Sequence, residues 1–309
     1  MDFGINPVAL FAGLVVAATP LLFAALGELV VEKAGVLNLG VEGMMIIGAV
    51  TGFAVGVATA DPGFGFLAAA AAGAVLALLF GLLTQFLLSN QVATGLALTL
   101  FGLGLAALIG QPFTGIRSPS MPRVFVEGLS DLPVVGRLLF NYDLVVYLGL
   151  AMAGLVWFFL SRTRAGLILR AVGENHDAAH SLGYGVIRVR LMAIAFGGAM
   201  AGIGGAYISL ARVPQWTEGM TAGAGWIALA IVVFSAWRPG RVVLGAWLFG
   251  GVTILQLNLQ AGGLAVPALY LSMLPYLVTI VVLVVISADR RRASLNAPAC
   301  LARPFHATG

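Results

Sequence analysis

The sequence predicts an all-α protein, a polytopic membrane bundle of about nine helices, with eight to ten compatible with the length. Hydrophobic residues make up 61% of the chain and charged residues only 9%, against about 25% charged in ordinary globular domains. The 16 basic and 12 acidic side chains are too few to cover the surface of a soluble protein of 309 residues. Apolar runs of about 20 residues, the length that crosses a bilayer, recur along the chain.

Nine apolar segments carry this prediction. The first has no Lys or Arg before it, so it is interpreted as a retained helix and not as a signal peptide. The second carries Asn38 and Glu42 near its start, and the seventh is short. The approximate bounds are Val8–Leu26, Val36–Ala58, Phe64–Leu88, Val92–Ile109, Tyr142–Leu160, Leu191–Ala211, Ala222–Trp237, Val242–Leu259 and Ala268–Ser287.

Glycines recur at four-residue spacing in two of these segments. Gly48, Gly52 and Gly56 form one such series, and Gly198 and Gly202 form another. In lipid, small residues at this spacing let helix backbones approach closely. We expect these faces to pack within the bundle, with a subunit interface as the alternative.

The basic residues predict the orientation, because cytoplasmic loops carry an excess of Lys and Arg. With the N-terminus outside, twelve basic residues fall on the inner side, and the reverse orientation would invert that excess. The inner residues are Lys33, Arg162, Arg164, Arg170, Arg188, Arg190, Arg238, Arg241, Arg290, Arg291, Arg292 and Arg303. The outer residues are Arg117, Arg123, Arg137 and Arg212. The N-terminus is therefore predicted outside and the C-terminus in the cytoplasm.

Residues 1–288 are predicted to form one transmembrane domain with two long loops. The outer loop, 110–141, contains four prolines and is expected to be irregular. The inner loop, 161–190, has no proline, and Arg170–Leu182 is compatible with one short helix that Gly183 and Gly185 would end. Residues 289–309 are predicted to be a disordered cytoplasmic tail.

Several kinds of chemistry are disfavoured by single residues. Lys33 is the only lysine and precedes Ala34, so the chain lacks the Gly-Lys-Ser/Thr of a Walker A phosphate loop. Cys300 is the only cysteine, which leaves no intrachain disulfide. His176 and His180 share a helix face, but the zincin pattern needs Glu where Asp177 stands. We therefore predict no catalytic residue, no metal and no cofactor, and we expect no nucleic-acid partner.

Polar side chains near membrane depth are candidates for a transport pathway or its gate. Glu42 is the only arguable ionisable residue, since Glu28 and Glu32 are expected among headgroups in the inner loop. For Glu42 the alternatives are a bond to a neighbouring helix end or to Lys33. Amides either line a pathway or join helices. The candidates are Asn38, Glu42, Asn90, Gln91, Gln256, Asn258 and Gln260.

The inner loop and the N-terminal third resemble a known family. Glu174, the Ala178-Ala179 pair and Gly183 match the coupling loop of ATP-binding-cassette (ABC) importer permeases. The string from Gly27 to Met45 is similar to the branched-chain-amino-acid/ribose class, and within it to permeases that work with basic-membrane-protein lipoproteins. Further matching segments are 90–97, 170–205 and Leu274-Pro275-Tyr276-Leu277.

The resemblance implies a permease in the bacterial plasma membrane, partnered by an ABC ATPase that binds the ATP, a second permease subunit and a substrate-binding lipoprotein. It implies a cytoplasmic coupling helix that docks on the ATPase. The implied docking residues are Glu174, Asp177, Ala178, Ala179 and Gly183. Nucleosides are the expected cargo, with simple sugars or branched-chain amino acids as alternatives. An ion-coupled secondary transporter is the rival function, which the scarcity of mid-span charge disfavours.

Overall fold

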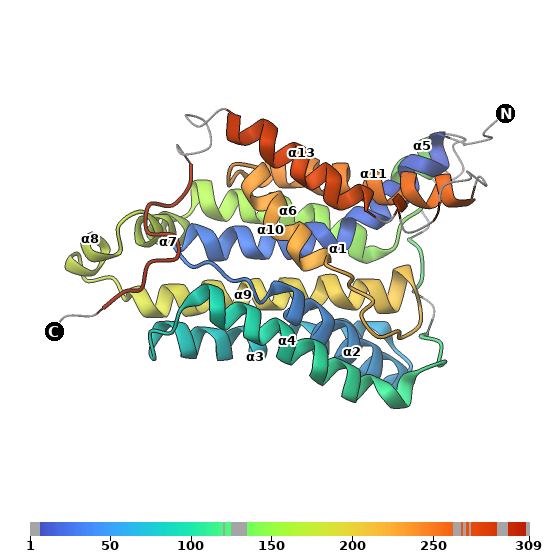
Figure 1. Ribbon diagram of the computed structural model, residues 1–309, viewed down its shortest axis with the longest axis horizontal. Helices are drawn as coiled ribbons and strands as arrows, with labels where there is room; N and C mark the ends of the chain where they lie inside the picture. The colour runs from blue at the N-terminus through green and yellow to red at the C-terminus, as the bar shows by residue number, and fades with distance from the viewer. Residues whose placement is uncertain are drawn as a thin grey trace.

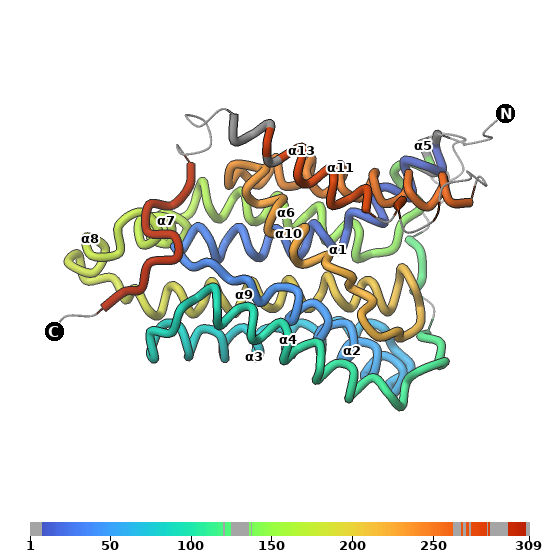
Figure 2. The backbone as a smooth tube through the Cα atoms, in the orientation of Figure 1, coloured from blue at the N-terminus to red at the C-terminus, as the bar shows by residue number. Residues whose placement is uncertain are grey.

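The computed structural model describes residues 7–119, 121–124, 135–261, 267, 270–271, 273–288 and 296–306. Within these residues the protein is helical, with only isolated β-bridges outside the helices (Figure 1). The helices run along the long axis of the molecule, and the short helices α7 and α8 lie at one end, which we call the α7–α8 end. The N-terminus lies at the opposite end (Figure 2).

Among the described residues, seven helices are long and apolar enough to cross a membrane. They are α1 (Pro7–Lys33), α2 (Val41–Thr59), α3 (Pro62–Gln85), α4 (Gln91–Gly110), α6 (Leu144–Arg162), α9 (Val186–Tyr207) and α11 (Pro239–Ala261). Two shorter apolar helices, α10 (Ala224–Phe234) and α13 (Leu274–Ala288), correspond to the seventh and ninth predicted segments. The polytopic helical bundle is thus confirmed.

The prediction that the seventh segment, Ala222–Trp237, crosses the membrane as one helix is wrong. Its helix, α10, has only 11 residues, and the preceding residues 213–223 are not helical. These residues lead from the N-terminal end, where α9 finishes, back into the bundle, and α10 then runs towards the α7–α8 end (Figure 1). A hydropathy profile shows one apolar run and does not distinguish a half-helix from a helix that crosses the membrane.

The second segment also begins later than predicted. Residues 36–40 are not helical, and α2 starts at Val41 instead of Val36. The hydroxyl of Thr99 donates to the Leu39 carbonyl at 3.1 Å. Thr99 lies eight residues into α4, about 12 Å from its start at 1.5 Å per residue. Helix α2 therefore begins inside the bundle.

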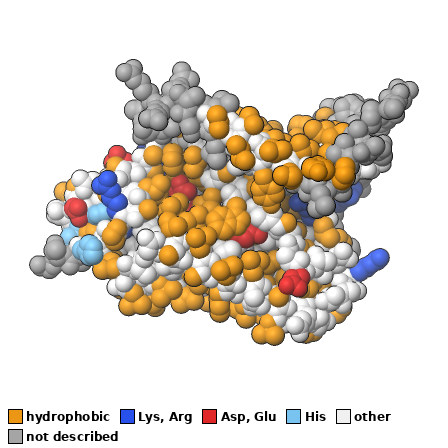
Figure 3. All heavy atoms as spheres, viewed as in Figure 1, with side chains coloured by type: hydrophobic (Ala, Val, Ile, Leu, Met, Phe, Trp, Pro, Cys, Tyr) orange, Lys and Arg blue, Asp and Glu red, His pale blue; other side chains and the backbone are white. Residues whose placement is uncertain are grey.

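Close glycine contacts hold the centre of the bundle together. A Cβ added to Gly48 of α2 would overlap the backbone of Gly202 of α9, and one added to Gly73 of α3 would overlap that of Gly198. The two predicted glycine series therefore face helices of the same chain. The α7–α8 end is the polar end, where histidines lie beside basic and acidic side chains, while apolar side chains dominate the long face in view (Figure 3).

Short helical elements lie at both ends of the bundle. In the loop 110–141, α5 (Val135–Leu139) and a single 3-10 turn, Gln111–Phe113, are the helical parts of the described residues. A π-helical turn, Ile208–Arg212, continues α9. At the other end α7 (Arg164–Glu174) and α8 (His176–Ser181) replace the single helix predicted over Arg170–Leu182.

Candidate functional site

Helices α7 and α8 are separated at Asn175, which is why the prediction of one helix is wrong. Asn175 adopts extended backbone angles, and its side chain accepts a hydrogen bond from the Ala178 amide at 3.0 Å. Asparagine is a preferred residue for this capping role. The predicted stop is confirmed at Gly183, whose φ of +88° suits glycine and whose amide donates to the His180 carbonyl.

The predicted docking residues do not all share one surface. Glu174, Asp177, Ala178 and Gly183 are exposed at the end of the molecule. Ala179 is buried instead and packs in a small cluster with Val172, Val186 and Phe305. The exposed face of α8 therefore carries Asp177 and Ala178, and the Ala179 side holds the helix on the bundle.

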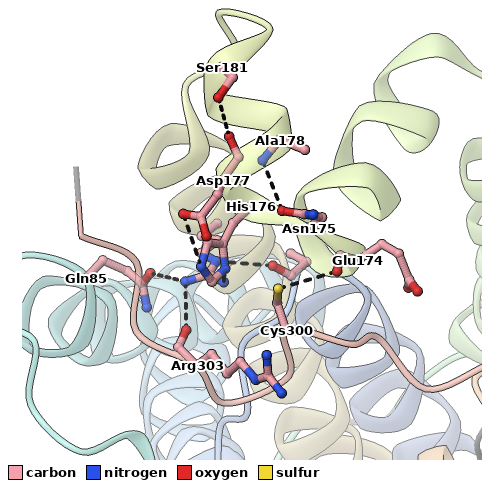
Figure 4. Close-up of polar contacts among 11 residues, drawn as sticks. Gln85, Glu174, Asn175, His176, Asp177, Ala178, Ser181, Cys300 and Arg303 are labelled. Carbon is pink, nitrogen blue, oxygen red and sulfur yellow. Dashed lines mark hydrogen bonds and ion pairs between the residues drawn. The ribbon is translucent and has the colours of Figure 1, made fainter. Parts of the chain in front are cut away.

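Arg190 is the residue that fastens α8 to the membrane helices. Its side chain is fully buried. The guanidinium donates to the carbonyls of Ala34 at the end of α1 and of Arg303 in the tail, each at 3.2 Å, and to Oε1 of Gln85 at 3.3 Å. His176 Nδ1 lies 3.1 Å from the Nη2 atom of the same side chain. Figure 4 shows Gln85, Arg303 and His176 converging on this point.

The last described residues form a strap over this end, so the prediction of a disordered tail is wrong for 296–306. The Cys300 amide donates to the Gly173 carbonyl at 2.9 Å, and the Ala302 amide donates to the Gly35 carbonyl at 3.2 Å. Lys33 donates through Nζ to the Asn296 carbonyl at 2.8 Å. These partners come from distant parts of the chain, so local composition gives no sign of them. Residues 289–295 lie outside the described part.

The strap ends on an aromatic contact with α8. The Phe305 ring is 5% exposed and lies edge-on to the rings of His176 and His180, with centroids 5.3 Å apart in both pairs. Burial lowers the pKa of His176 below its usual value, and the Arg190 charge adds to this, while Asp177 opposes it. A neutral His176 accepts a hydrogen bond from Arg190 at Nδ1, which a protonated ring cannot do.

Glu42 joins α2 and α10, the two helices that begin inside the bundle and that we call the interrupted helices. Its carboxylate accepts hydrogen bonds from the Thr221 hydroxyl at 2.6 Å, the Gly223 amide at 3.0 Å and the Gly225 amide at 2.6 Å. These amides belong to the start of α10, where unpaired N–H groups favour an anion. Of the two partners expected for Glu42, a helix end and Lys33, the structure has the helix end. A side chain at Gly225 would overlap the Glu42 backbone.

Glu28 and Glu32 lie inside α1, so their expected place in a loop among headgroups is wrong. Each side chain is 1% exposed. Oε1 of Glu28 accepts from the Asn38 amide at 3.1 Å, and Oε2 of Glu32 accepts from the Trp237 indole at 2.5 Å. The two carboxylates thus tie the end of α1 to the extended segment 34–40 and to the end of α10.

Four of the six amide candidates form two groups: two stabilise the extended segment, and two bond to the helix that they cap or belong to. Oε1 of Gln91 accepts from the Leu37 amide at 2.9 Å, and Oδ1 of Asn38 accepts from the Gly40 amide at 2.9 Å, so both stabilise the extended segment. Asn90 caps α4 through the Ala93 amide, and Asn258 donates to the Ile254 carbonyl of its own helix. Gln260 lies in the last turn of α11.

Gln256 lines a cavity beside the Glu42 junction. The cavity measures about 430 Å³ and lies between α1, α10, α11 and α13. Its polar lining also includes Arg212, Thr221, Thr253 and Tyr276. The Tyr276 hydroxyl donates to the Ala222 carbonyl at 2.8 Å, which fixes the non-helical stretch. A larger cavity of about 840 Å³ shares Arg212 and Ala17 and continues towards the N-terminal end.

Comparison with known proteins assigns the family. Residues 10–283 match the model of the branched-chain amino acid transport system permease component. The chain belongs to this permease family. It is 45% identical to the provisionally named glucose ABC transporter permease protein TsgC13 of Haloferax volcanii, over 81% of this chain and 77% of the relative.

Two further relatives are 33% identical to the permease. The guanosine ABC transporter permease protein NupQ of Bacillus subtilis matches over 86% of this chain and 88% of its own length. The nucleoside ABC transporter permease protein NupC of Lactococcus lactis matches over 88% and 90%. The permease is therefore an ABC permease subunit and a multi-pass membrane protein, and the rival reading as an ion-coupled transporter is not supported.

Sequence reasoning missed four residues that the permease places at the cavity: Arg212, Thr221, Thr253 and Tyr276. It also missed the role of Arg190, which was counted only as a loop arginine. One feature of the sequence could have indicated that Arg190 is buried. It lies four residues after Val186, on the face of α9 that packs inward. The cavity residues come from segments that meet only in the folded chain.

Proposed function

We propose that this permease imports nucleosides, driven by an ABC ATPase that docks on α8 at the cytoplasmic side. The observation that carries the proposal is the attachment of α8, an exposed short helix that the buried Arg190 fastens to α1 and α3. A helix that transmits motion must be accessible to its partner and rigidly held by the parts that it moves. Helix α8 meets both requirements.

The proposed orientation puts the α7–α8 end in the cytoplasm. The basic residues Lys33, Arg162, Arg170 and Arg241 belong to helix ends or loops on this side, in line with the positive-inside rule. The exposed Glu174 and Asp177 would then face basic groups of the ATPase, and Ala178 would allow close approach. The N-terminal end would receive cargo from a substrate-binding lipoprotein.

Motion of α8 has a physical route to the interior. Arg190 holds the Ala34 carbonyl, where α1 gives way to the extended segment 34–40. That segment leads directly into the first turn of α2, where Glu42 holds the start of α10. A displacement of α8 that shifts Ala34 would therefore move both interrupted helices, and we propose that this movement opens and closes the pathway.

The cavity beside α10 suits an uncharged, hydrogen-bonding cargo. Gln256 offers an uncharged donor and acceptor, and Arg212 offers further donors. The hydroxyl oxygens of Thr221, Thr253 and Tyr276 offer acceptors, because their protons are donated within the protein. Together these groups match ribose hydroxyls and base edges. The guanosine and nucleoside permeases among the relatives support this cargo. A simple sugar such as glucose is the second candidate, favoured by the 45% identity to the Haloferax protein. A second permease subunit is expected to complete the pathway.

Uptake in proteoliposomes tests the proposal. The permease is reconstituted with the ATPase, second permease and binding lipoprotein of its own system, and uptake of labelled guanosine, adenosine and glucose is compared with and without ATP. We expect ATP-dependent uptake of the nucleosides. Ala178→Arg should leave ATP hydrolysis but abolish its coupling to uptake, whereas Gly240→Arg, at an open position in the first turn of α11, should leave the coupling intact.

Three results would each overturn a part of the proposal. Uptake of glucose but not of nucleosides would replace the cargo and leave the ABC mechanism intact. Uptake that is indifferent to ATP and abolished by an ionophore would reject the ATP-driven mechanism itself. Equal loss of coupling in the Ala178 and Gly240 variants would reject α8 as the docking element.

A further inference from the structure

A groove on the membrane face, separate from the cavity described above, lies beside α7. It encloses about 370 Å³ between α1, α6, α7 and α9. Its described lining is entirely apolar and includes Val30, Met152, Phe159 and Phe196. A groove of this composition offers nothing to a polar solute but fits a hydrocarbon chain.

The groove opens to the outside of the bundle. Leu155 of α6 and Met192 of α9 line it, and each side chain is 57% exposed. The lining residues of α6 lie between Met152 and Phe159, and those of α9 lie between Val189 and Phe196, so the groove occupies the half of the bundle next to the α7–α8 end. Lipid is the medium that this face meets in a multi-pass membrane protein.

Two arginines continue the groove at that end. On a helix, residues three or four apart lie on one face. Arg162 therefore continues the row Leu155–Phe159 of α6, and Arg188 continues the row Met192–Phe196 of α9. Both side chains are exposed, and among the described residues neither has a carboxylate or another hydrogen-bond partner.

We infer that this groove binds an anionic phospholipid, with one acyl chain in the groove and the phosphate between Arg162 and Arg188. The basic rim matches a negative headgroup, and the apolar interior matches its chain. Basic sites between membrane helices at the cytoplasmic surface are suited to anionic headgroups. The groove contacts Leu169 of α7, so the bound lipid would lie directly beneath the helices that hold α8.

Native mass spectrometry of the full-length permease in detergent tests this inference. Phosphatidylglycerol and phosphatidylcholine with identical acyl chains are titrated in parallel, and glycerophosphate is added as a competitor without chains. We expect phosphatidylglycerol to be retained in preference, and glycerophosphate not to displace it. Arg162→Gln/Arg188→Gln should reduce the preference by about tenfold or more, given the contribution of each basic residue near a membrane surface.

A matched control and a groove-filling variant separate this site from general basicity. Arg238→Gln/Arg241→Gln removes two exposed arginines, one just before α11 and one in its first turn, and should leave the preference unchanged. Ala165→Trp fills the groove from the exposed side of α7 and should reduce retention of both lipids. Ala165→Trp changes no buried position, so folding is preserved and can be checked by thermal unfolding.

Four outcomes would overturn the inference. The wild-type permease could show no preference for phosphatidylglycerol, or the control pair could lose as much preference as the Arg162/Arg188 pair. Displacement by glycerophosphate would assign the arginines to a phosphate ion alone. A permease dimer that Ala165→Trp dissociates would assign the groove to a second subunit. None of these results depends on the cargo.

Discussion

Nδ1 of His176 lies 3.1 Å from Nη2 of Arg190, and this contact joins the exposed helix α8 to the buried start of α9. The same guanidinium reaches the end of α1, the end of α3 and the C-terminal strap. Among the described residues it has no carboxylate partner, so carbonyl, amide and imidazole groups satisfy its donors. One side chain therefore links α8, the helix proposed to dock on the ATPase, to α1, α3 and α9.

Arg190→Gln is expected to loosen α8 without changing its exposed face. The shorter amide cannot reach all four partners, and the buried groups left without a donor should cost about 2–3 kcal/mol of stability. We expect a lower Tm and ATP hydrolysis that no longer drives uptake. Arg241→Gln, an exposed arginine at the same end, serves as the control and should change neither. Normal coupling in Arg190→Gln would contradict the proposed route.

The attachment of α8 to the bundle should loosen in mild acid. The pKa of His176 is lowered in the folded protein, so its neutral form contributes stability above the unfolded pKa of about 6.5. That contribution is lost as the pH falls, because the unfolded chain takes up the proton first. Hydrogen exchange at residues 176–184 should accelerate between pH 7.5 and pH 5.5, after correction for intrinsic rates. His176→Gln should remove most of this change, and His180→Gln, an exposed histidine, should retain it.

Phe305→Ala should release the end of the strap. The ring is buried against both histidines, and its removal leaves no other aromatic contact to α8 in the described residues. We expect faster hydrogen exchange over 298–306 and weaker coupling of ATP hydrolysis to uptake. His306→Ala changes an exposed neighbour and should behave as the wild type. Unchanged exchange in Phe305→Ala would show that the backbone bonds of Cys300 and Ala302 suffice.

Glu42→Gln should disturb the junction of α2 and α10. The amide keeps one acceptor oxygen but loses its charge, and its NH2 group faces the N–H of either Gly223 or Gly225, donor against donor. Hydrogen bonds to a charged group contribute about 1.5–3 kcal/mol, so we expect a lower Tm and reduced uptake. Glu218→Gln, at an exposed position of the same loop, is the control. Unchanged uptake at every pH would indicate that Glu42 makes a structural contact and takes no part in transport.

Gln256→Leu should weaken cargo recognition at the cavity. The substitution keeps the size of the side chain and removes its hydrogen bonds, for which about tenfold lower apparent affinity in uptake is expected. Asn258→Leu is the matched control, because the bond that Asn258 makes among the described residues is to its own helix and because it lies outside the cavity lining. An equal effect of both variants would argue that Gln256 is an ordinary contact between helices.

The sequence by itself determined the bundle, its apolar segments and the glycine faces that pack inside it. A backbone in lipid must satisfy its own hydrogen bonds, so each long apolar run has only the helix available. Gly183 is likewise a local signal, since its positive φ follows from residue type and position. The resemblance to ABC permeases rested on such local strings and agrees with the family match.

Tertiary structure alone decided where helices stop inside the membrane and what holds them there. The half-helix α10 begins at Glu42, about 180 positions away in the chain, and Arg190 donates to carbonyls near both ends of the protein. The strap 296–306 is short, and its partners lie at the end of α1 and on α7, α8 and α9. Periodicity and composition report how one segment meets its surroundings, whereas these contacts depend on which distant segment supplies the partner.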